Sequence, residues 1–466
     1  MSRLDRFFVN DCWLLKWGNV VQQALSRSFY DHCPILLKND VPDWGPSPFR
    51  SNNCWFSHPG FSKFVNDEWN KFEVVGRGSY VFKEKLKILK GVLKAWNKEH
   101  FGILDKKIVD QVNIINSIDA KESEGDLTSE EVSSRRVATV HLWRFSMQKD
   151  SLLCQKSRLR WLWYGDCNSK LFHASINRRR LSNAILGLNI EGVWVDDPVH
   201  IKDFVRSSFH NRFSESHWNR PKLDGVDFNC ISKAENNFLT ARFEELEIKE
   251  AVWGCDGDKS PGPDGFNFAF IKNSWESFKG DIYSMVEDFF HTGSLAKGCN
   301  ASIVVLVPKN ECLQGLGEFR PISLVGCIYK IISKLLAGRL KKVLHLIISD
   351  SQSAFMKWRY IMDGVLIANE IIEQAKKSNA DDCFIFKVNF EKAYDSVNWS
   401  FLLYMMERMG FCCRWRNWIK ACLQSNSVSI LVNGSPTTEF GMCRGLRQGD
   451  SIAPFLFIIV AEGLVV

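Results

Sequence analysis

The sequence predicts an α+β protein in which a helical hairpin precedes a region of mixed strands and helices. Apolar residues recur every three or four positions from about Lys83 to residue 160. After Lys259, short apolar runs end at turn residues, which is typical of buried strands. At 466 residues the chain exceeds one ordinary core, so we expect two to four units.

The first 80 residues divide at a change of composition. Residues 1–40 end in the apolar run Pro34–Leu37, which predicts a short buried strand. The stretch NDVPDWGPSPF (39–49) is rich in Pro, Gly and Asp, so we assign residues 41–80 to a linker.

Residues 81–160 carry the helical pattern. The polar segment DAKESEGD (119–126) interrupts it, and Thr128 followed by Glu131 resembles a capping box that starts a return helix. We therefore predict an antiparallel helical hairpin, a common scaffold that does not indicate a function. The apolar positions are Leu86, Leu89, Leu93, Trp96, Ile108, Val112 and Ile115.

A basic-aromatic stretch (residues 155–181) begins at the end of the predicted hairpin and continues into the connecting region 161–255. Phosphates can bind the cations and bases can stack on the rings, as in a nucleic-acid site. An amphipathic helix with a solvated basic face and a buried aromatic face explains the composition equally well. The basic residues are Lys156, Arg158, Arg160, Lys170, Arg178, Arg179 and Arg180, and the aromatic ones are Trp161, Trp163, Tyr164 and Phe172.

Residues 256–466 form the strand-containing unit. We predict strands at 302–307, 383–390, 427–433 and 437–443, with helices between them and a turn at 434–436.

Composition and charge indicate which kinds of partner and cellular compartment are compatible with this sequence. A net charge of +7 permits a polyanionic partner without requiring one. The 15 cysteines show no CxxC pair or zinc-ligand spacing, which favours buried free thiols in a reducing compartment. We see no signal peptide and no apolar run long enough to span a bilayer. We expect a soluble intracellular protein of the nucleus or cytoplasm with no membrane partner, and the sequence does not indicate its oligomeric state.

Seven segments in order resemble the reverse transcriptase of plant LINE-type (non-LTR) retrotransposons. They are SPGPDGF (260–266), LVPK (306–309), FRPISLVGCIYKIISKLLAGRL (319–340), QSAFMKWRYIMDGVLIANE (352–370), FKVNFEKAYDSVNW (386–399), ILVNGSP (430–436) and GLRQGDSIAPFLF (445–457). The basic-aromatic stretch resembles the region before the polymerase in the same elements. The resemblance implies the fingers and an incomplete palm of a right-hand polymerase, with an antiparallel sheet.

The family's chemistry is RNA-directed DNA synthesis on an RNA template from a DNA primer, with deoxynucleotides and two Mg²⁺ ions held by carboxylates. Its first metal-binding Asp corresponds to Asn389 here, which is isosteric but uncharged. Losing such a ligand costs roughly a thousandfold or more in rate. We expect Asp395 to cap or orient the next helix instead. The chain also ends before the family's aromatic-Ala-Asp-Asp turn, so we expect a truncated, inactive polymerase without an intact metal site or productively bound Mg²⁺.

Five residues match the family's nucleotide and template positions. Tyr394 matches the aromatic residue beneath the sugar, or else is a packed tyrosine. Gln448 and Gly449 match the loop at the incoming nucleotide, where Gly permits close approach. Arg320 and Arg359 match positions that meet phosphate oxygens, although single arginines more often form surface ion pairs.

The N-terminal residues resemble the tail of an apurinic-type endonuclease. SRLDRF (2–7) and YDHCPILL (30–37) carry this resemblance, and Asp31 and His32 match its Asp-His pair. A lone Asp-His pair is otherwise a local hydrogen bond. Besides the inactive polymerase, two hypotheses remain: a non-catalytic nucleic-acid-binding remnant, and a chain without function as a protein.

Overall fold

A computed structural model describes most of the chain from residue 42 onward. The described residues are 42–122, 125–157, 169–215, 222–310, 315–356, 359–377, 388, 390 and 392–464, and, before these, 7–10, 13, 17, 20–24 and 35–39. In this part of the chain, no helix is both long and apolar enough to cross a membrane.

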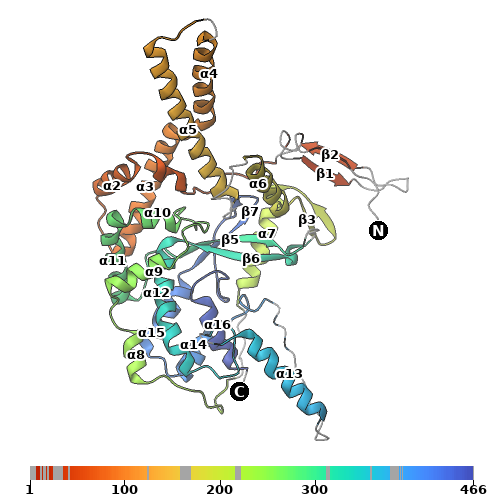
Figure 1. The fold of residues 1–466 in the computed structure, drawn as a ribbon. Helices are drawn as coiled ribbons and strands as arrows, with labels where there is room; N and C mark the ends of the chain where they lie inside the picture. Colours follow the sequence, from red (N-terminus) through yellow and green to blue (C-terminus); the bar gives the residue numbers. More distant parts are fainter. Residues whose placement is uncertain are drawn as a thin grey trace.

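The predicted hairpin is formed by α4 (Leu104–Glu122) and α5 (Ser129–Ser157), which project from the body as an arm (Figure 1). The capping box is confirmed: the Thr128 backbone N donates to Glu131 Oε2 at 3.1 Å, and the Glu131 N donates to Thr128 Oγ1 at 3.3 Å. The preceding helix α3 (Gly78–His100) instead packs in the body against α11 (Trp275–Thr292). Its periodic apolar residues Leu86, Leu89, Leu93 and Trp96 are buried.

The expected linker contains helices that belong to the core, so that prediction is corrected. A 3-10 helix, η1 (Asn53–Ser57), is followed by α2 (Phe61–Lys71). Trp55, Phe61 and Trp69 are almost completely buried, and the Trp69 ring lies 4.3 Å from that of Phe278 in α11. The Pro/Gly composition ends at Phe49, and the apolar spacing of four residues from Phe61 to Trp69 is already helical.

The central sheet is mixed. Its strands are β5 (Ala301–Pro308), β6 (Phe319–Val325), β7 (Ser427–Val432), β8 (Ser435–Pro436) and β9 (Phe440–Gly441). Strand β5 pairs antiparallel with β6, with Val304 opposite Ser323, and parallel with β7, with Val304 opposite Ile430. Antiparallel pairing is therefore present, but the parallel β5–β7 pair makes the whole sheet mixed.

The strand predictions at 302–307 and 427–433 are confirmed as β5 and β7. The one at 437–443 shortens to β9, and β6 was not predicted as a strand. The strand at 383–390 lies outside the described residues except for Val388 and Phe390, which belong to no strand.

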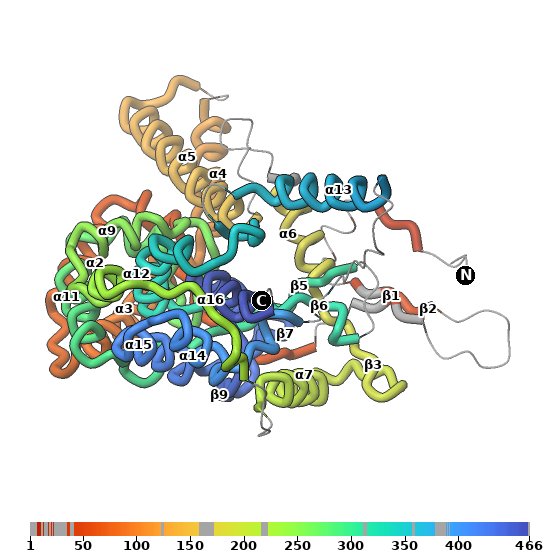
Figure 2. The backbone as a smooth tube through the Cα atoms, turned by 90° about the horizontal axis from the view of Figure 1, so that it is seen from below, coloured from red at the N-terminus to blue at the C-terminus, as the bar shows by residue number. Residues whose placement is uncertain are grey.

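Most of the helices pack into one hydrophobic core that also contains the sheet. Besides α2, α3 and α11, they are α7 (Pro198–Phe213), α8 (Lys233–Leu239), α9 (Glu245–Trp253), α10 (Phe268–Asn273), α12 (Cys327–Val343), α14 (Trp399–Arg408), α15 (Cys413–Gln424) and α16 (Ala453–Glu462). Helix α13 (Ile361–Lys377) stands apart from α12, α14, α15 and α16 in both views (Figures 1 and 2) and has no buried residue.

Smaller elements complete the described fold. Helix α6 (Ser169–Asn183) follows the arm and precedes the hairpin of β3 (Leu188–Ile190) and β4 (Val193–Val195). Two 3-10 helices, η3 (Leu316–Glu318) and η4 (Leu344–Leu346), flank β6 and α12. Near the N-terminus, β1 (Val20–Ala24) pairs antiparallel with β2 (Ile35–Asn39), so the strand predicted at 34–37 is present from Ile35 onward. Its predicted burial is wrong, because Leu36 is 44% exposed and Ile35 and Leu37 are only partly buried.

Candidate active site

Three of the family-like segments meet at one loop, Gly445–Asp450, which we call the hub loop. Its Leu446 N donates to the Tyr394 carbonyl, and its Gly445 N donates to the Val397 carbonyl, both at 2.7 Å. On its other side, Gln448 O accepts from the backbone N of Ser323 in β6, also at 2.7 Å. Residues some 50 to 125 positions apart are thus joined by backbone hydrogen bonds.

Two glycines make these close approaches possible. Gly445 and Gly449 have φ angles of +88° and +111°, which side-chain-bearing residues rarely adopt. A Cβ on Gly445 would lie 2.8 Å from the Asp395 carbonyl oxygen, and one on Gly449 would lie 2.8 Å from the Ser323 carbonyl oxygen. The loop therefore requires glycine at both positions.

A buried polar network anchors the hub loop to α12. Arg447 Nη2 lies 3.2 Å from Asp450 Oδ2, and both side chains are about 95% buried. Tyr329 Oη donates to Asp450 Oδ2 at 2.7 Å, and Ser333 Oγ donates to Asp450 Oδ1. Arg447 also donates to Asn300 Oδ1 at 2.7 Å and lies over the Tyr329 ring. Each charge is paired and hydrogen-bonded, which is what burial of an ion pair demands.

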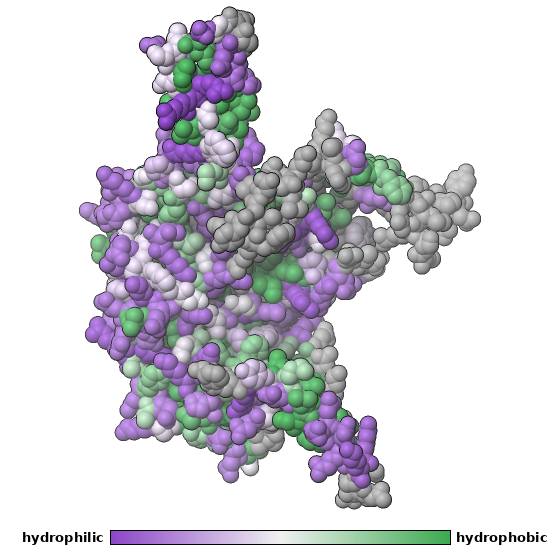
Figure 3. Space-filling model, viewed as in Figure 1, coloured by the Kyte–Doolittle hydropathy of each residue, from purple (hydrophilic) through white to green (hydrophobic). Residues whose placement is uncertain are grey.

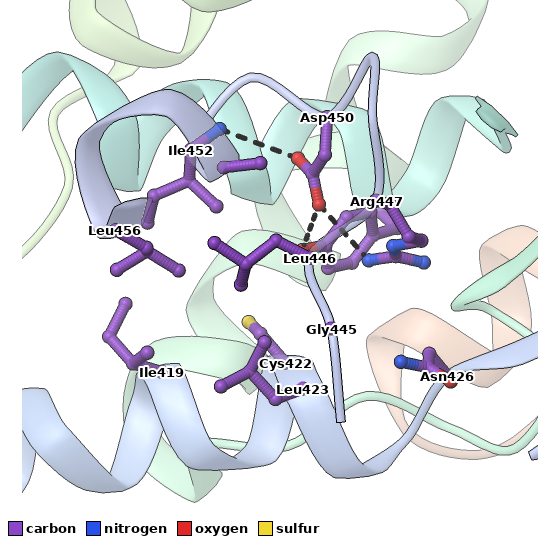
Figure 4. Close-up of a pocket in the computed structure, with 12 residues that line it drawn as sticks. Ile419, Cys422, Leu423, Asn426, Gly445, Leu446, Arg447, Asp450, Ile452 and Leu456 are labelled. Carbon is purple, nitrogen blue, oxygen red and sulfur yellow. Dashed lines mark hydrogen bonds and ion pairs between the residues drawn. The ribbon is translucent and has the colours of Figure 1, made fainter. Parts of the chain in front are cut away.

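The network borders a cavity of about 10 Å³ that also touches Cys422 and Leu456 (Figure 4). That volume is about the room for one water molecule and cannot hold a nucleotide. Burial raises the pKa of the Cys422 thiol to about 12, so the thiol is neutral near pH 7. Sequence reasoning missed Arg447, Asp450 and their partners. Opposite charges three residues apart, directly before the apolar run that begins at Ile452, are the signal that could have found them.

Arg320, Gln448 and Gly449 are the predicted nucleotide residues that lie near one another. Arg320 and Ile322 share one face of β6 because side chains alternate along a strand. Ile322 is also the side chain closest to Gly449, with its Cγ2 3.8 Å from where a Cβ would lie. Arg320 and Gly449 are exposed and Gln448 is half-buried.

Tyr394 is half-buried and stacked on Phe457 of α16, with ring centroids 5.1 Å apart and planes inclined by 18°. Burial raises the pKa of its phenol. This is the arrangement of a packed tyrosine, although its backbone carbonyl does touch the hub loop.

Arg359 does not join the hub in the described part of the chain. Its guanidinium donates to the carbonyls of Ser349 and Gln352 at 2.6 and 2.8 Å, and pairs with Asp350 at 2.9 Å. It thus holds its own loop together, as an arginine with a structural role would.

Asp395 does not cap the next helix, contrary to expectation. The cap of α14 is Asn398, whose Oδ1 accepts from the Phe401 N at 2.7 Å. Asp395 is buried and pairs with Arg212 of α7, with Oδ2 and Nη1 3.6 Å apart. Burial raises its carboxyl pKa, and the charge of Arg212 opposes that shift.

The described residues do not fit a two-magnesium site. Among them, no three His, Cys, Asp or Glu side chains gather as metal ligands. Asp395 and Asp450 are each committed to an arginine. Asn389, the position matching the family's metal-binding Asp, lies outside the described residues, as do Asp31 and His32.

The basic-aromatic stretch is described in part. Arg178, Arg179 and Arg180 are exposed on α6, and Lys156 is exposed near the end of α5. Phe172 is 2% exposed, so it is a core residue and cannot stack on a base. Arg158, Arg160, Trp161, Trp163 and Tyr164 lie outside the described residues, as does the side chain of Lys170.

Comparison with known proteins agrees with the convergence of these motifs. A family model described as "Reverse transcriptase (RNA-dependent DNA polymerase)" matches residues 307–465, which include β6 and the hub loop. The "Retrovirus-related Pol polyprotein from type-1 retrotransposable element R2" of Popillia japonica is 26% identical over 47% of this chain. This chain carries a reverse transcriptase domain of the non-LTR retrotransposon type.

Other relatives extend the similarity beyond the reverse transcriptase domain. The "Transposon TX1 uncharacterized 149 kDa protein" of Xenopus laevis is 24% identical over 99% of the chain. The R2DM Pol polyprotein of Drosophila melanogaster is 24% identical over 44%. The chain spans 36% of the frog protein, 30% of the beetle protein and 19% of the fly protein.

Proposed function

We propose that this chain is a polymerisation-incompetent reverse transcriptase of the plant LINE type that retains nucleic-acid binding. The observation that carries the proposal is Asn389 at the position of the family's metal-binding Asp. An amide removes one negative charge beside two dications and weakens the hold on both. In this proposal residues 256–466 are the fingers and part of the palm.

The pairing of the nearby carboxylates supports the inactive state. Asp395 and Asp450 are buried against Arg212 and Arg447, so neither carboxylate is available as a replacement ligand. Freeing Asp450 would leave the buried Arg447 without its charged partner, which is strongly destabilising.

Primer extension tests the proposal. The purified chain should add no deoxynucleotide to a DNA primer on an RNA template with Mg²⁺ or Mn²⁺, whereas an active retrotransposon reverse transcriptase does so in parallel. Measurable incorporation by the chain would overturn the proposal.

Nucleic-acid binding is the second part of the proposal, and the exposed arginines of α6 support it. Lys and Arg contacts to phosphates release counterions, so affinity should fall steeply with salt. Changing Arg178, Arg179 and Arg180 to Ala should flatten the dependence of log affinity on log salt by about 0.9 for each lost duplex contact. An unchanged slope would show that these arginines do not contact the nucleic acid.

We also assign the N-terminal residues to the tail of an endonuclease domain. Asp31 and His32 fall in the connection between the antiparallel strands β1 and β2. A nucleus or cytoplasm location agrees with the cysteines of the described residues, all of which are free.

A further inference from the structure

We infer that a row of lysines on α3 extends the basic surface of α6 and binds the phosphate backbone of a nucleic-acid duplex. This inference rests on the proposed nucleic-acid binding and adds a second contact surface, remote in sequence. The row, called the lysine stripe below, comprises Lys83, Lys87, Lys90, Lys94 and Lys98.

The stripe follows from the periodicity of α3. The first four lysines each come one residue after a buried apolar residue, namely Phe82, Leu86, Leu89 and Leu93. Steps of three and four residues keep the lysines on one side of the helix. The row is about 22 Å long, with about 5–6 Å between successive lysines along the axis. Such a row can neutralise several successive phosphates.

The far end of the stripe is available to a ligand. Lys94 and Lys98 are exposed and form no ion pair among the residues that the structure describes. Lys87 is also exposed, and its nearest acidic partner is Glu84 at 3.5 Å. Lys83 pairs more closely with Glu84, at 3.1 Å, and lies at the more enclosed end. The charge available for a polyanion is therefore greatest from Lys87 to Lys98.

Gly91 lies in the middle of the stripe, four residues after Lys87 and three before Lys94. A glycine inside a helix is destabilising relative to alanine. Packing does not require it, because a Cβ built there meets no atom within 4 Å. Because Gly91 has no side chain, the helix surface between Lys87 and Lys94 is low, and a sugar-phosphate backbone can approach the helix closely there.

Side-chain contacts connect the stripe to the basic end of the arm. Lys90 lies over the Phe49 ring, with Nζ 5.6 Å from its centroid. Two residues after Phe49, the Ser51 carbonyl accepts from Gln155 Nε2 of α5 at 3.3 Å. Lys156 is the next residue of α5, and the carbonyl of Ser157 accepts from Arg179 of α6.

The segment 49–53 therefore joins α3 to the root of the arm. Gln155 forms two hydrogen bonds with this segment, because its Oε1 also accepts from the Asn53 N at 2.9 Å. Helices α3 and α6 flank the arm root (Figure 1). These contacts bring three basic parts of the sequence together at the arm root: α3, the end of α5, and α6.

The chemistry of the stripe favours a duplex over a single strand. Single-strand sites combine cations with aromatic rings on which bases stack. Of the aromatic residues of α3, Phe82 and Trp96 are buried, and the exposed Tyr80 precedes the stripe, with Lys83 Nζ 5.3 Å from its ring centroid. From Lys87 to Lys98, α3 has no exposed aromatic residue, so this row of lysines can recognise phosphates but carries no base specificity.

The test compares two triple variants that lose the same positive charge. One replaces Lys87, Lys94 and Lys98 with Gln, and the control replaces the exposed Lys341, Lys376 and Lys377 with Gln. Gln and Lys have similar helix propensities, so unchanged circular dichroism and unchanged thermal unfolding are expected for both. Fluorescence anisotropy then measures binding to an RNA–DNA duplex and to single-stranded RNA over a range of salt concentrations.

The stripe variant should lose about 2 to 3 units of slope in log affinity against log salt on the duplex, and the control should not. Gly91→Glu, which removes no lysine, should weaken duplex binding in the same direction. Equal effects of the two triple variants, or a stripe effect confined to single-stranded RNA, would overturn the inference.

The result separates this inference from the proposed function. If Arg178, Arg179 and Arg180→Ala weakens binding while the stripe variant matches wild type, only the stripe is refuted. If the wild-type chain does not bind the RNA–DNA duplex, the proposed nucleic-acid binding is refuted as well.

Discussion

The hub loop and helix α13 both belong to family-like segments, yet the hub loop is largely buried and α13 is exposed. In the hub loop Arg447 and Asp450 are about 95% buried and every side-chain charge has a partner. Helix α13 has no buried residue, and Ile361, Leu366 and Ile367 are 58–69% exposed. Figure 3 shows apolar surface where this helix leaves the body.

The difference shows that motif identity does not determine burial. The hub loop is enclosed because β6, residues 394–397 and α12 all contact it. No described residue encloses α13 in the same way, although its apolar positions recur at helical spacing. Contacts from distant segments decide which motif becomes core.

The largest effect is expected from breaking the hub. Asp450→Ala leaves Arg447 buried without its counter-charge and should lower the free energy of unfolding by about 3–5 kcal/mol. Asp350→Ala, at a fully exposed carboxylate paired with Arg359, is the matched control and should have a much smaller effect because solvent screens the pair. Urea denaturation measures both, and equal losses would refute the claim that the hub anchors the fold.

Gly449→Ala should have the next largest effect. The new methyl group would meet the Ser323 carbonyl in a backbone conformation that alanine disfavours, at a cost of about 1–3 kcal/mol. Gly441→Ala in β9, where no atom lies within 4 Å of a Cβ and φ is not positive, should be nearly neutral. Similar melting temperatures for the two variants would contradict this prediction.

Cys422 makes the hub's stability sensitive to alkaline pH. Burial raises its pKa from 9.0 to about 12, so above pH 9 the unfolded chain releases this proton while the folded chain keeps it. Stability should therefore fall by about 1 kcal/mol per pH unit from pH 9 toward 12. Cys422→Ala should remove that part of the slope in denaturation measured from pH 7 to 10.5, and an identical slope would show that this thiol is not responsible.

The smallest effect is expected in α13. Leu366→Ser should change the free energy of unfolding by less than about 0.5 kcal/mol because the side chain is already exposed. Leu402→Ser in α14, at a fully buried position, should cost about 2–5 kcal/mol. A large loss for Leu366→Ser would show that α13 is packed in solution.

Local patterns predicted the elements that depend on local chemistry. The capping box at Thr128, the arm helices and strands β5 and β7 all follow from periodicity and turn residues. The helices at 53–71 were missed because the Pro/Gly-rich segment before them was extended too far. Strand β6 was missed because Pro321 and two polar residues, Arg320 and Ser323, obscure its apolar pattern.

The sequence alone determined the reverse transcriptase resemblance, the amide at position 389 and the candidate contacts at Arg320, Gln448 and Gly449. Side-chain type and spacing suffice for these, since they are properties of the chain itself. Only the tertiary structure decided that Arg359 holds its own loop, that Asp395 pairs with Arg212, and that Arg179 of α6 donates to the Ser157 carbonyl at the end of α5. Such pairings join residues far apart along the chain, and their free energy depends on burial and distance, which no local pattern encodes.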